Sequence, residues 1–589
     1  MNFTDPHQAF ADFFQDKDLR GLAYGLSKRV VEGHLCLEVE SYNKDVLEYR
    51  KSLKEIEVQS LRYPTTIEEK SVLENSYIYF PQRGGDLNKP FVYDNGKFYL
   101  ARYWFYEKNI LNRAKELLNR EFISKDTILK ESDFIRDLFN SSEKIINWQL
   151  VATISSLLKS FSIITGGPGT GKTTTIAKLL AIVIKIDPTI KIALAAPTGK
   201  AATRMNESLN NSINDKNYGL QAPEEIKKAI GNLKAETIHR LLGWKDKTHY
   251  FIHDRKDPLN YDLIIVDEAS MIDVSLMSKL LDAIPETGKI ILLGDKNQLA
   301  SVEAGSVFGD ICRTQGKTTN NLNRDTIEIY NICNGFGDLL PFETSLNFFS
   351  GSIVELIVSR RFKDSEGIGK FSKSVILGES SIVDDPEFSK EETEGESVYI
   401  TEKYNSLSRY YRKYKDYLRE PDIDKALEKF DNFRLLTATN DDQFGLHTYN
   451  KNVEEYLGLN RGNHPFYHNQ PIMITKNNSK LGIYNGDIGI VREYEGRLYL
   501  YFSKDKKVSV VHIVDYVTAF AITIHKSQGS EFKEVLIVLP ENGSKILSRE
   551  LLYTAVTRAK KRATIVAKNG ILKEAISTGV ERSSGIVDV

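Results

Sequence analysis

Short, continuous apolar runs in the N-terminal half of the chain predict its central architecture. The runs are FSIITG (161–166), KIALAAP (191–197), DLIIVDEA (262–269) and KIILLGD (289–295). Apolar runs without apolar–polar alternation are typical of parallel strands that are buried on both faces. The segments between them have helical periodicity, as in TTTIAKLLAIVIKI (173–186). This alternation of strands and helices predicts a doubly wound α/β domain.

A second group of apolar runs in the C-terminal half predicts a second α/β domain. These runs are FRLLTATN (433–440), VLIVLP (535–540) and ATIVAK (563–568). Residues 462–518 interrupt them with short strands separated by Asn, Gly and Asp, which predicts a small β-rich, SH3-like insert. We therefore expect three domains, at residues 1–140, 141–350 and 351–589.

The N-terminal region has mixed α and β character and no catalytic motif. FVYDNGKFYL (91–100) predicts a hairpin, because Asn95-Gly96 is a preferred turn pair between two strands. We expect the nearby aromatic side chains to lie mostly in the core, and a partner surface is the alternative; they are Phe98, Tyr99, Tyr103, Trp104 and Phe105. Residues 374–400 are polar and acidic, so we expect a solvated loop or insert.

Composition narrows the class of protein but does not select a function. The chain has 589 residues, of which 41% are hydrophobic and 27% charged, as in ordinary globular proteins of several domains. Lys and Arg number 79 against 80 Asp and Glu, so any nucleic-acid binding must come from local patches. The three cysteines, Cys36, Cys312 and Cys333, have no metal-site spacing. With no secretory signal or membrane-length apolar run, we expect a cytoplasmic protein.

The stretch TGGPGTGKTTT (165–175) predicts a nucleotide site. It fits G-x-x-x-x-G-K-[ST] between a predicted strand and a predicted helix, whereas an ordinary glycine-rich turn would lack that context. Backbone amides would cradle the phosphates, Lys172 would bridge the β- and γ-phosphates, and Thr173 would ligate Mg²⁺. The cofactors expected are ATP and Mg²⁺. The residues of the loop are Gly166, Gly167, Pro168, Gly169, Thr170, Gly171, Lys172, Thr173 and Thr174.

An acidic pair ends the later apolar strand LIIV (263–266). Asp267 is placed to hold Mg²⁺, and Glu268 to polarise an attacking water. A kinase has little use for a water-activating glutamate, so the pair favours hydrolysis over phosphate transfer. An acidic pair that merely ends a strand is common, but it is less expected after a phosphate loop.

Seven further stretches occur in order along the chain. They are INWQLVA (146–152), APTGKAATRM (196–205), TIHRLLG (237–243), GDKNQLASVEAGSVFGD (294–310), GIYNGDIGIV (482–491), TIHKSQGSEF (523–532) and YTAVTRAKK (553–561). This ordered set resembles superfamily 1 DNA helicases and, more closely, the RecD family, the alpha subunit of exodeoxyribonuclease V. The resemblance covers about 145–568. It implies two RecA-like domains that close on ATP.

The resemblance implies roles for matching residues. Gln149 would recognise adenine, Gln298 would sense the γ-phosphate, and Arg361 and Arg558 would be arginine fingers, with Arg360 a competing candidate. Either arginine taken alone would more often be a surface ion pair. The residues matching the family's DNA-binding positions are Thr198, Lys200, Thr237, His239, Thr523, His525 and Ser527. For His525 alone, a core histidine is the alternative.

The function implied is that of an ATP-dependent DNA helicase moving 5′ to 3′. The family works in double-strand-break repair and recombination, in the RecBCD complex with beta (RecB-like) and gamma (RecC-like) subunits. Duplex ends are the substrate, a single strand is held during translocation, and nuclease activity is expected only in a partner. Two alternatives stay open: a stand-alone superfamily 1 helicase, and an architectural or regulatory ATPase subunit. Residues 1–140 are the candidate partner surface.

Overall fold

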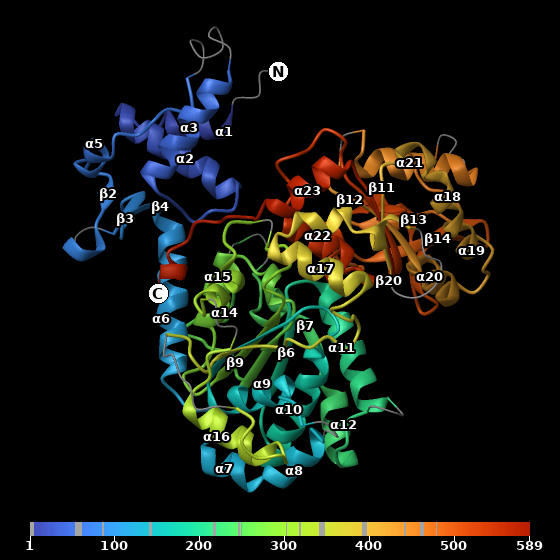
Figure 1. The fold of residues 1–589 in the computed structure, drawn as a ribbon, viewed down its shortest axis with the longest axis horizontal. Helices are drawn as coiled ribbons and strands as arrows, with labels where there is room; N and C mark the ends of the chain where they lie inside the picture. The colour runs from blue at the N-terminus through green and yellow to red at the C-terminus, as the bar shows by residue number, and fades with distance from the viewer. Residues whose placement is uncertain are drawn as a thin grey trace.

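In the computed structural model, the described part of the chain contains four β-sheets, arranged in three units (Figure 1). The structure describes residues 5–53, 62–84, 87–140, 144–215, 219–245, 248, 250–301, 303–316, 320–340, 348–390, 397–440, 443–459, 464–478 and 480–588. No helix within these ranges is long and apolar enough to cross a membrane.

The N-terminal unit, blue in Figure 1, combines helices with a four-stranded sheet of order β1-β4-β3-β2. Its strands are β1 (Cys36–Leu37), β2 (Ile78–Tyr79), β3 (Phe91–Asp94) and β4 (Lys97–Leu100), and its helices are α1 (Pro6–Ala11), α2 (Lys17–Val31), α3 (Val39–Ser52) and α5 (Glu69–Leu73). β3 and β4 form the predicted hairpin, and both turn residues have positive φ, 48° at Asn95 and 78° at Gly96. Phe98, Tyr99 and Trp104 are buried, whereas Phe105 is 38% exposed.

The first α/β unit is built on a parallel sheet of order β10-β5-β9-β8-β6-β7. The strands are β5 (Phe161–Thr165), β6 (Ile192–Ala196), β7 (Ala235–Thr237), β8 (Leu263–Val266), β9 (Lys289–Gly294) and β10 (Ile353–Glu355). The four strands predicted from apolar runs are confirmed. Helices cover both faces; they are α9 (Trp148–Leu158), α10 (Lys172–Ile186), α11 (Gly199–Asn214), α12 (Glu224–Asn232), α13 (Ile238–Leu241), α14 (Val274–Asp282), α15 (Val307–Arg313) and α16 (Arg324–Cys333).

Three helices that precede residue 140 pack on the first α/β unit. They are α6 (Ala101–Leu118), α7 (Lys125–Lys130) and α8 (Ser132–Leu138). Ile110, Leu111 and Leu117 of α6 lie in one core with strands β5, β8 and β9. At the other expected boundary, β10 follows residue 350 but pairs with β5. Apolar packing therefore extends the first unit beyond residues 141–350 in both directions.

The second α/β unit, yellow to red in Figure 1, has a parallel sheet of order β11-β20-β19-β12-β18. Its strands are β11 (Ser397–Thr401), β12 (Phe433–Thr437), β18 (Ala521–Thr523), β19 (Phe532–Val538) and β20 (Ala559–Val566). Its helices are α17 (Gly367–Leu377), α18 (Ser408–Tyr411), α19 (Lys415–Leu418), α20 (Ile423–Asp431), α21 (Leu446–Leu457), α22 (Arg549–Val556) and α23 (Asn569–Ser577). The three predicted strands are confirmed.

One sequence expectation for this unit is wrong. Residues 374–400 were expected to form a solvated loop or insert, yet they include the end of α17 and most of β11. Residues 391–396 of this stretch lie outside the described residues. Ile382, Val383, Phe388 and Val398 are buried in the core of the unit. These few apolar residues anchor an otherwise acidic segment, and their spacing follows no single period.

A five-stranded antiparallel sheet lies between α21 and β18 along the chain, where the β-rich insert was predicted. Its order is β16-β15-β14-β13-β17. The strands are β13 (Pro471–Ile474), β14 (Ile488–Tyr494), β15 (Arg497–Ser503), β16 (Lys506–Ser509) and β17 (Tyr516–Thr518). Ile472, Val491 and Leu500 form the centre of a separate small core.

Candidate active site

The phosphate loop joins β5 to α10, the arrangement that its sequence predicts. Gly169 and Gly171 have φ of 79° and 87°, a conformation that glycine adopts without strain. A Cβ on Gly171 would lie 2.2 Å from Nε2 of Gln149, and one on Gly169 would lie 2.3 Å from Cβ of Arg361. Lys172 folds back so that its Nζ donates to the carbonyl oxygens of Gly166 at 2.6 Å and Gly167 at 3.3 Å. The loop is thus shaped as an anion cradle at a helix N-terminus.

The acidic pair follows β8 directly and faces the loop. Glu268 has φ of 53°, which is unusual for a residue with a side chain, and its N–H donates to Oδ1 of Asp267 at 2.8 Å. Burial and the neighbouring Glu268 carboxylate raise the pKa of Asp267 to about 6. Both residues line a cavity of about 300 Å³ together with Lys172 and Thr173. This phosphate cavity therefore combines a lysine, a hydroxyl and two carboxylates.

A second cavity, of about 270 Å³, adjoins the loop on its other side. Its lining residues are Ile145, Ile146, Asn147, Trp148, Gln149, Thr170, Leu356, Val358 and Arg360. Nε2 of Gln149 donates to the carbonyl oxygen of Thr170 at 3.1 Å. Oε1 of Gln149 is buried and has no hydrogen-bond partner among the described residues. An apolar slot with one free carbonyl oxygen suits a flat base that carries an amino group, and we call this second cavity the base cavity.

The segment after β9 is bonded to the second unit. Nη2 of Arg558 donates to Oε1 of Gln298 at 2.6 Å, and the Tyr553 hydroxyl donates to Oδ2 of Asp295 at 2.9 Å. The N–H of Leu299 donates to Oγ1 of Thr554 at 2.9 Å. Gln298 and Arg558 also line the phosphate cavity. A change at the phosphates thus has a direct polar route from one α/β unit to the other.

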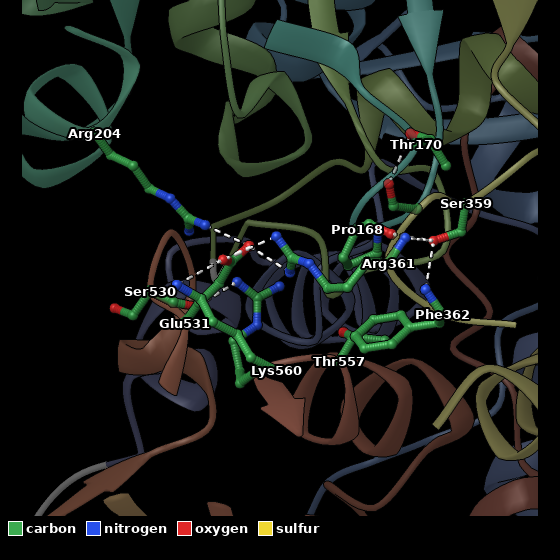
Figure 2. Close-up of polar contacts among 12 residues, drawn as sticks. Pro168, Thr170, Arg204, Ser359, Arg361, Phe362, Ser530, Glu531, Thr557 and Lys560 are labelled. Atoms are coloured by element: carbon green, nitrogen blue, oxygen red, sulfur yellow. Dashed lines mark hydrogen bonds and ion pairs between the residues drawn. The ribbon is translucent and has the colours of Figure 1, made fainter. Parts of the chain in front are cut away.

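Arg361 reaches the phosphate cavity from the connection between the two units, whereas Arg360 lines the base cavity. Figure 2 shows the Arg361 guanidinium meeting the Glu531 carboxylate, which also meets Arg204. The Ser359 hydroxyl donates to the Pro168 carbonyl oxygen at 3.1 Å and holds this connection against the phosphate loop. The geometry therefore favours Arg361 over Arg360 as the candidate finger.

Two charged residues of this cavity were not predicted from the sequence, Arg204 and Glu531. Both lie inside stretches already singled out, APTGKAATRM and TIHKSQGSEF. Arg204 comes from α11 and Glu531 precedes β19, so more than 300 positions of sequence separate them. The sequence shows only that each of the two positions is charged, and this does not identify Arg204 and Glu531 as a pair.

The structure gives internal partners to the four hydroxyl residues proposed to bind DNA. Thr198 caps α11 and Thr237 caps α13, each accepting the backbone N–H of the third residue of its helix. Oγ1 of Thr523 accepts the N–H of Lys526, and the buried Ser527 hydroxyl donates to the carbonyl oxygen of Ile524. Thr198 and Thr237 follow the adjacent strands β6 and β7, so they share one edge of the first sheet.

Of the three remaining DNA candidates, Lys200 and His525 are half-buried and His239 is exposed. His239 lies against the Phe251 ring at a centroid distance of 5.6 Å, and desolvation by its surroundings lowers its pKa, as it does for His525. Burial lowers the pKa of Lys200 to about 8. A Cβ on the neighbouring Gly199 would lie 3.1 Å from Cβ of Tyr484, so the β-rich insert packs closely over the start of α11.

Comparisons with known proteins agree with this geometry. Residues 149–304 match the family model described as AAA domain, and residues 518–566 match the UvrD-like helicase C-terminal domain. The chain is 32% identical to the RecBCD enzyme subunit RecD of Haemophilus influenzae, over 96% of this chain and 92% of that protein. It is 27% identical to the ATP-dependent RecD2 DNA helicase of Deinococcus radiodurans, over 68% of this chain but 46% of that protein.

A solved structure is also similar, the Pif1 helicase from Bacteroides in complex with ADP-AlF3 and single-stranded DNA. It is 18% identical and covers 77% of this chain and 94% of its own, with a TM-score of 0.36. This similarity is too low to support a conclusion about the fold. The strand order of the sheets establishes the fold.

Proposed function

We infer that this chain, which belongs to the RecD family of superfamily 1 DNA helicases and is a DNA-dependent ATP hydrolase, moves along single-stranded DNA by opening and closing its two α/β units on ATP. The observation that carries this proposal is the phosphate cavity. Lys172, Thr173 and Glu268 line it from the first unit, and Arg558 lines it from the second. A nucleotide bound there would be held by both units at once.

We assign the chemistry to these side chains. Glu268 would take a proton from the attacking water, whose oxygen forms a bond to the γ-phosphorus while the bond to ADP breaks. Lys172, Arg361 and Arg558 would stabilise the charge on the transferring group, and Gln298 would sense the γ-phosphate. Gln149 would select adenine through its free Oε1. Release of the γ-phosphate would remove the shared anion and let the two units separate.

The donors present fit a magnesium ion. The Thr173 hydroxyl and the Asp267 carboxylate are oxygen ligands that line one cavity. Burial, together with the Glu268 carboxylate, raises the pKa of Asp267, and a bound cation would offset this unfavourable charge. Mg²⁺ held there would supply positive charge beside the phosphates. Thr173 and Asp267 would hold it directly or through water.

For DNA we propose a track along the edge of the first sheet where β6 and β7 end, continued by the segment around His525. The N-termini of α11 and α13 lie on this edge and offer backbone N–H groups to phosphates. Lys200 and His239 lie beside them. Thr198, Thr237, Thr523 and Ser527 would then act mainly by fixing local backbone, because their hydroxyls have internal partners. The 5′-to-3′ direction follows from family membership.

We further propose that the chain works as a subunit of an exodeoxyribonuclease V (RecBCD-type) complex with RecB-like and RecC-like partners, acting on duplex ends in double-strand-break repair. The chain is 32% identical to the Haemophilus subunit and 27% identical to the Deinococcus RecD2 helicase, which supports the subunit over the stand-alone alternative. Residues 1–140 are the proposed partner region, although α6 to α8 pack on the first α/β unit. The SH3-like nature of the insert and a cytoplasmic location belong to this proposal. A division into domains near residues 141–350 and 351–589 is also proposed, with α6 to α8 and β10 packed in the first unit from outside 141–350.

The test is ATP hydrolysis by the purified chain with and without single-stranded DNA, compared with Lys172→Ala. We expect stimulation by DNA in the wild type and none in the variant, in the chain alone or after addition of the two partner subunits. Unwinding by the complete complex that is unaffected by Lys172→Ala combined with Glu268→Gln would instead support an architectural role.

A further inference from the structure

The Glu531 carboxylate has an unusual set of neighbours for a single acidic group. It faces Arg361 in a fork, with Nη1 at 2.8 Å from Oε1 and Nη2 donating to Oε2 at 3.0 Å. Nη2 of Arg204 also pairs with Oε1, and Nζ of Lys560 lies 3.7 Å from Oε2. The Glu531 side chain is only 13% exposed. One carboxylate therefore pairs with two guanidinium groups inside the phosphate cavity (Figure 2).

The three paired residues come from different parts of the fold. Arg204 belongs to α11 of the first unit, Arg361 to the connection after β10, and Glu531 to the second unit just before β19. All three line the same cavity as Lys172, Glu268 and Arg558. The two arginines thus point toward the space expected to receive the γ-phosphate, and an anion of the protein already pairs with them.

We propose that Glu531 is a positioning residue: its carboxylate stands in for the γ-phosphate and holds Arg204 and Arg361 until ATP displaces the carboxylate. In the ATP-bound state, Arg204 is then a further ligand of the γ-phosphate. The inference rests on the proposed function, since it requires ATP in the phosphate cavity. A carboxylate and a γ-phosphate offer the same kind of oxygen to a guanidinium fork. They carry like charges, so they cannot share the two arginines at close range.

This exchange would make the site respond to the third phosphate. ADP has no γ-phosphate, so Glu531 would keep both arginines when ADP is bound. Burial raises the pKa of Glu531, but the charges of Arg204 and Arg361 outweigh that effect and lower the pKa to about 2. The carboxylate is therefore ionised at neutral pH and competes as an anion. Transfer of the arginines to ATP would free Glu531 from Arg204 and alter the contact between the two units.

The chain offers a matched control in Glu534, three positions further on. Glu534 also pairs with two cations, Lys413 and Arg562, and its side chain is 21% exposed. It does not line the phosphate cavity. Replacing Glu534 therefore removes a similar ion-pair network from the same strand region without touching the nucleotide.

The experiment compares the dissociation constants of ATPγS and ADP for the wild type, Glu531→Gln and Glu534→Gln, by competition with a fluorescent nucleotide. For Glu531→Gln we expect ATPγS to bind about tenfold more tightly, the effect of one lost charge interaction equal to a single pKa unit, and ADP to change by less than about twofold. Glu534→Gln should match the wild type for both nucleotides. Adding Arg204→Ala to Glu531→Gln should remove most of the gain. Melting temperatures would verify that each variant is folded.

Two results would overturn the inference alone, given normal nucleotide binding by the wild type. Equal tightening of ATPγS and ADP would mean that Glu531 only repels phosphates in general. Weaker ATPγS binding would mean that Glu531 supports the arginines in the bound state instead of competing with the γ-phosphate. If the wild type bound neither nucleotide, the proposed function would fail as well.

Discussion

The free oxygen of Gln149 provides a prediction at the scale of one residue. Gln149→Ala removes the one buried acceptor of the base cavity that has no partner among the described residues. We expect the KM for ATP to rise by about tenfold, the cost of about one hydrogen bond to a buried polar group. We expect the wild type to use GTP poorly, because guanine has no amino group where adenine has one, and this use to change little in the variant. Steady-state hydrolysis of both nucleotides in the presence of single-stranded DNA measures this. An equal rise for ATP and GTP would show that Gln149 supports the loop through Thr170 without selecting the base.

Glu268 provides a second prediction, about the chemical step. Glu268→Gln keeps the size of the side chain but removes its ability to accept a proton. We expect kcat to fall by about 10²- to 10⁴-fold, the usual contribution of general base catalysis, with the dissociation constant of ATP nearly unchanged. Equilibrium binding measured beside single-turnover hydrolysis separates the two effects. A loss of binding that equals the loss of rate would instead assign Glu268 to holding the nucleotide.

At the scale of elements, Thr198 has two candidate roles that a pair of variants can separate. Its hydroxyl caps α11 by accepting the N–H of Ala201 at 3.2 Å. Thr198→Ala should lower the free energy of unfolding by about 1 kcal/mol, as expected for a lost N-cap, and weaken binding of single-stranded DNA by loosening the helix start. Thr198→Ser keeps the cap and should restore both quantities. Chemical denaturation and fluorescence anisotropy measure them. If Thr198→Ser restored stability but not DNA binding, the threonine would contact DNA itself.

The elements themselves were largely predictable, because their signals are local. Continuous apolar runs predicted strands β5, β6, β8 and β9, and a glycine-rich loop before a helix predicted the phosphate site. The 374–400 segment was mispredicted because its apolar residues, such as Phe388, are few and lie in acidic surroundings, and their burial depends on distant partners. The place of β10 in the first sheet was also not predictable, because its pairing with β5 depends on tertiary contacts.

The site was predictable only where one motif carries the whole role. Lys172, Asp267 and Glu268 follow from spacing beside a strand. The pairing of Glu531 with Arg204 and Arg361 does not, because a charged residue looks the same in sequence whether it meets solvent or a partner from another unit. The hydroxyls of Thr523 and Ser527 are the opposite case. Hydroxyl groups are suited to contacts with DNA phosphates, but in the structure both form hydrogen bonds within the protein.

At the scale of the whole molecule, the segment after α23 connects all three units. Nη2 of Arg582 donates to the carbonyl oxygen of Ser301 in the first α/β unit, and the N–H of Leu35 in the N-terminal unit donates to the carbonyl oxygen of Ser583. Ile586 lies in the core beneath α6, next to which Figure 1 places the C-terminus. Movement of the second unit on ATP binding would therefore be transmitted to the N-terminal unit through this segment.

A buried acid at this junction makes the stability of the assembly depend on pH. Glu107 of α6 is fully buried, and its Oε2 accepts the N–H of Gly585 at 2.9 Å. Burial raises the pKa of Glu107 from 4.5 to about 7. Between these values the folded protein holds a proton that the unfolded chain has released, so stability falls as the pH rises through this window. The full cost above pH 7 is about 3 kcal/mol, from the size of the shift.

Glu107→Gln removes this titration while keeping an acceptor for Gly585. We expect the variant to be more stable than the wild type above pH 7, by up to about 3 kcal/mol, with the difference vanishing below about pH 4.5. Melting curves from pH 4.5 to 8.5 measure it. Glu116→Gln on the same helix is the control. Slight burial raises the pKa of Glu116, but pairing with Arg113 and Arg255 outweighs it and lowers the pKa, so that variant should gain nothing above pH 7. Parallel pH profiles for wild type and Glu107→Gln would show that Glu107 ionises normally in the folded protein, and that the junction is then hydrated enough to let the C-terminal segment move.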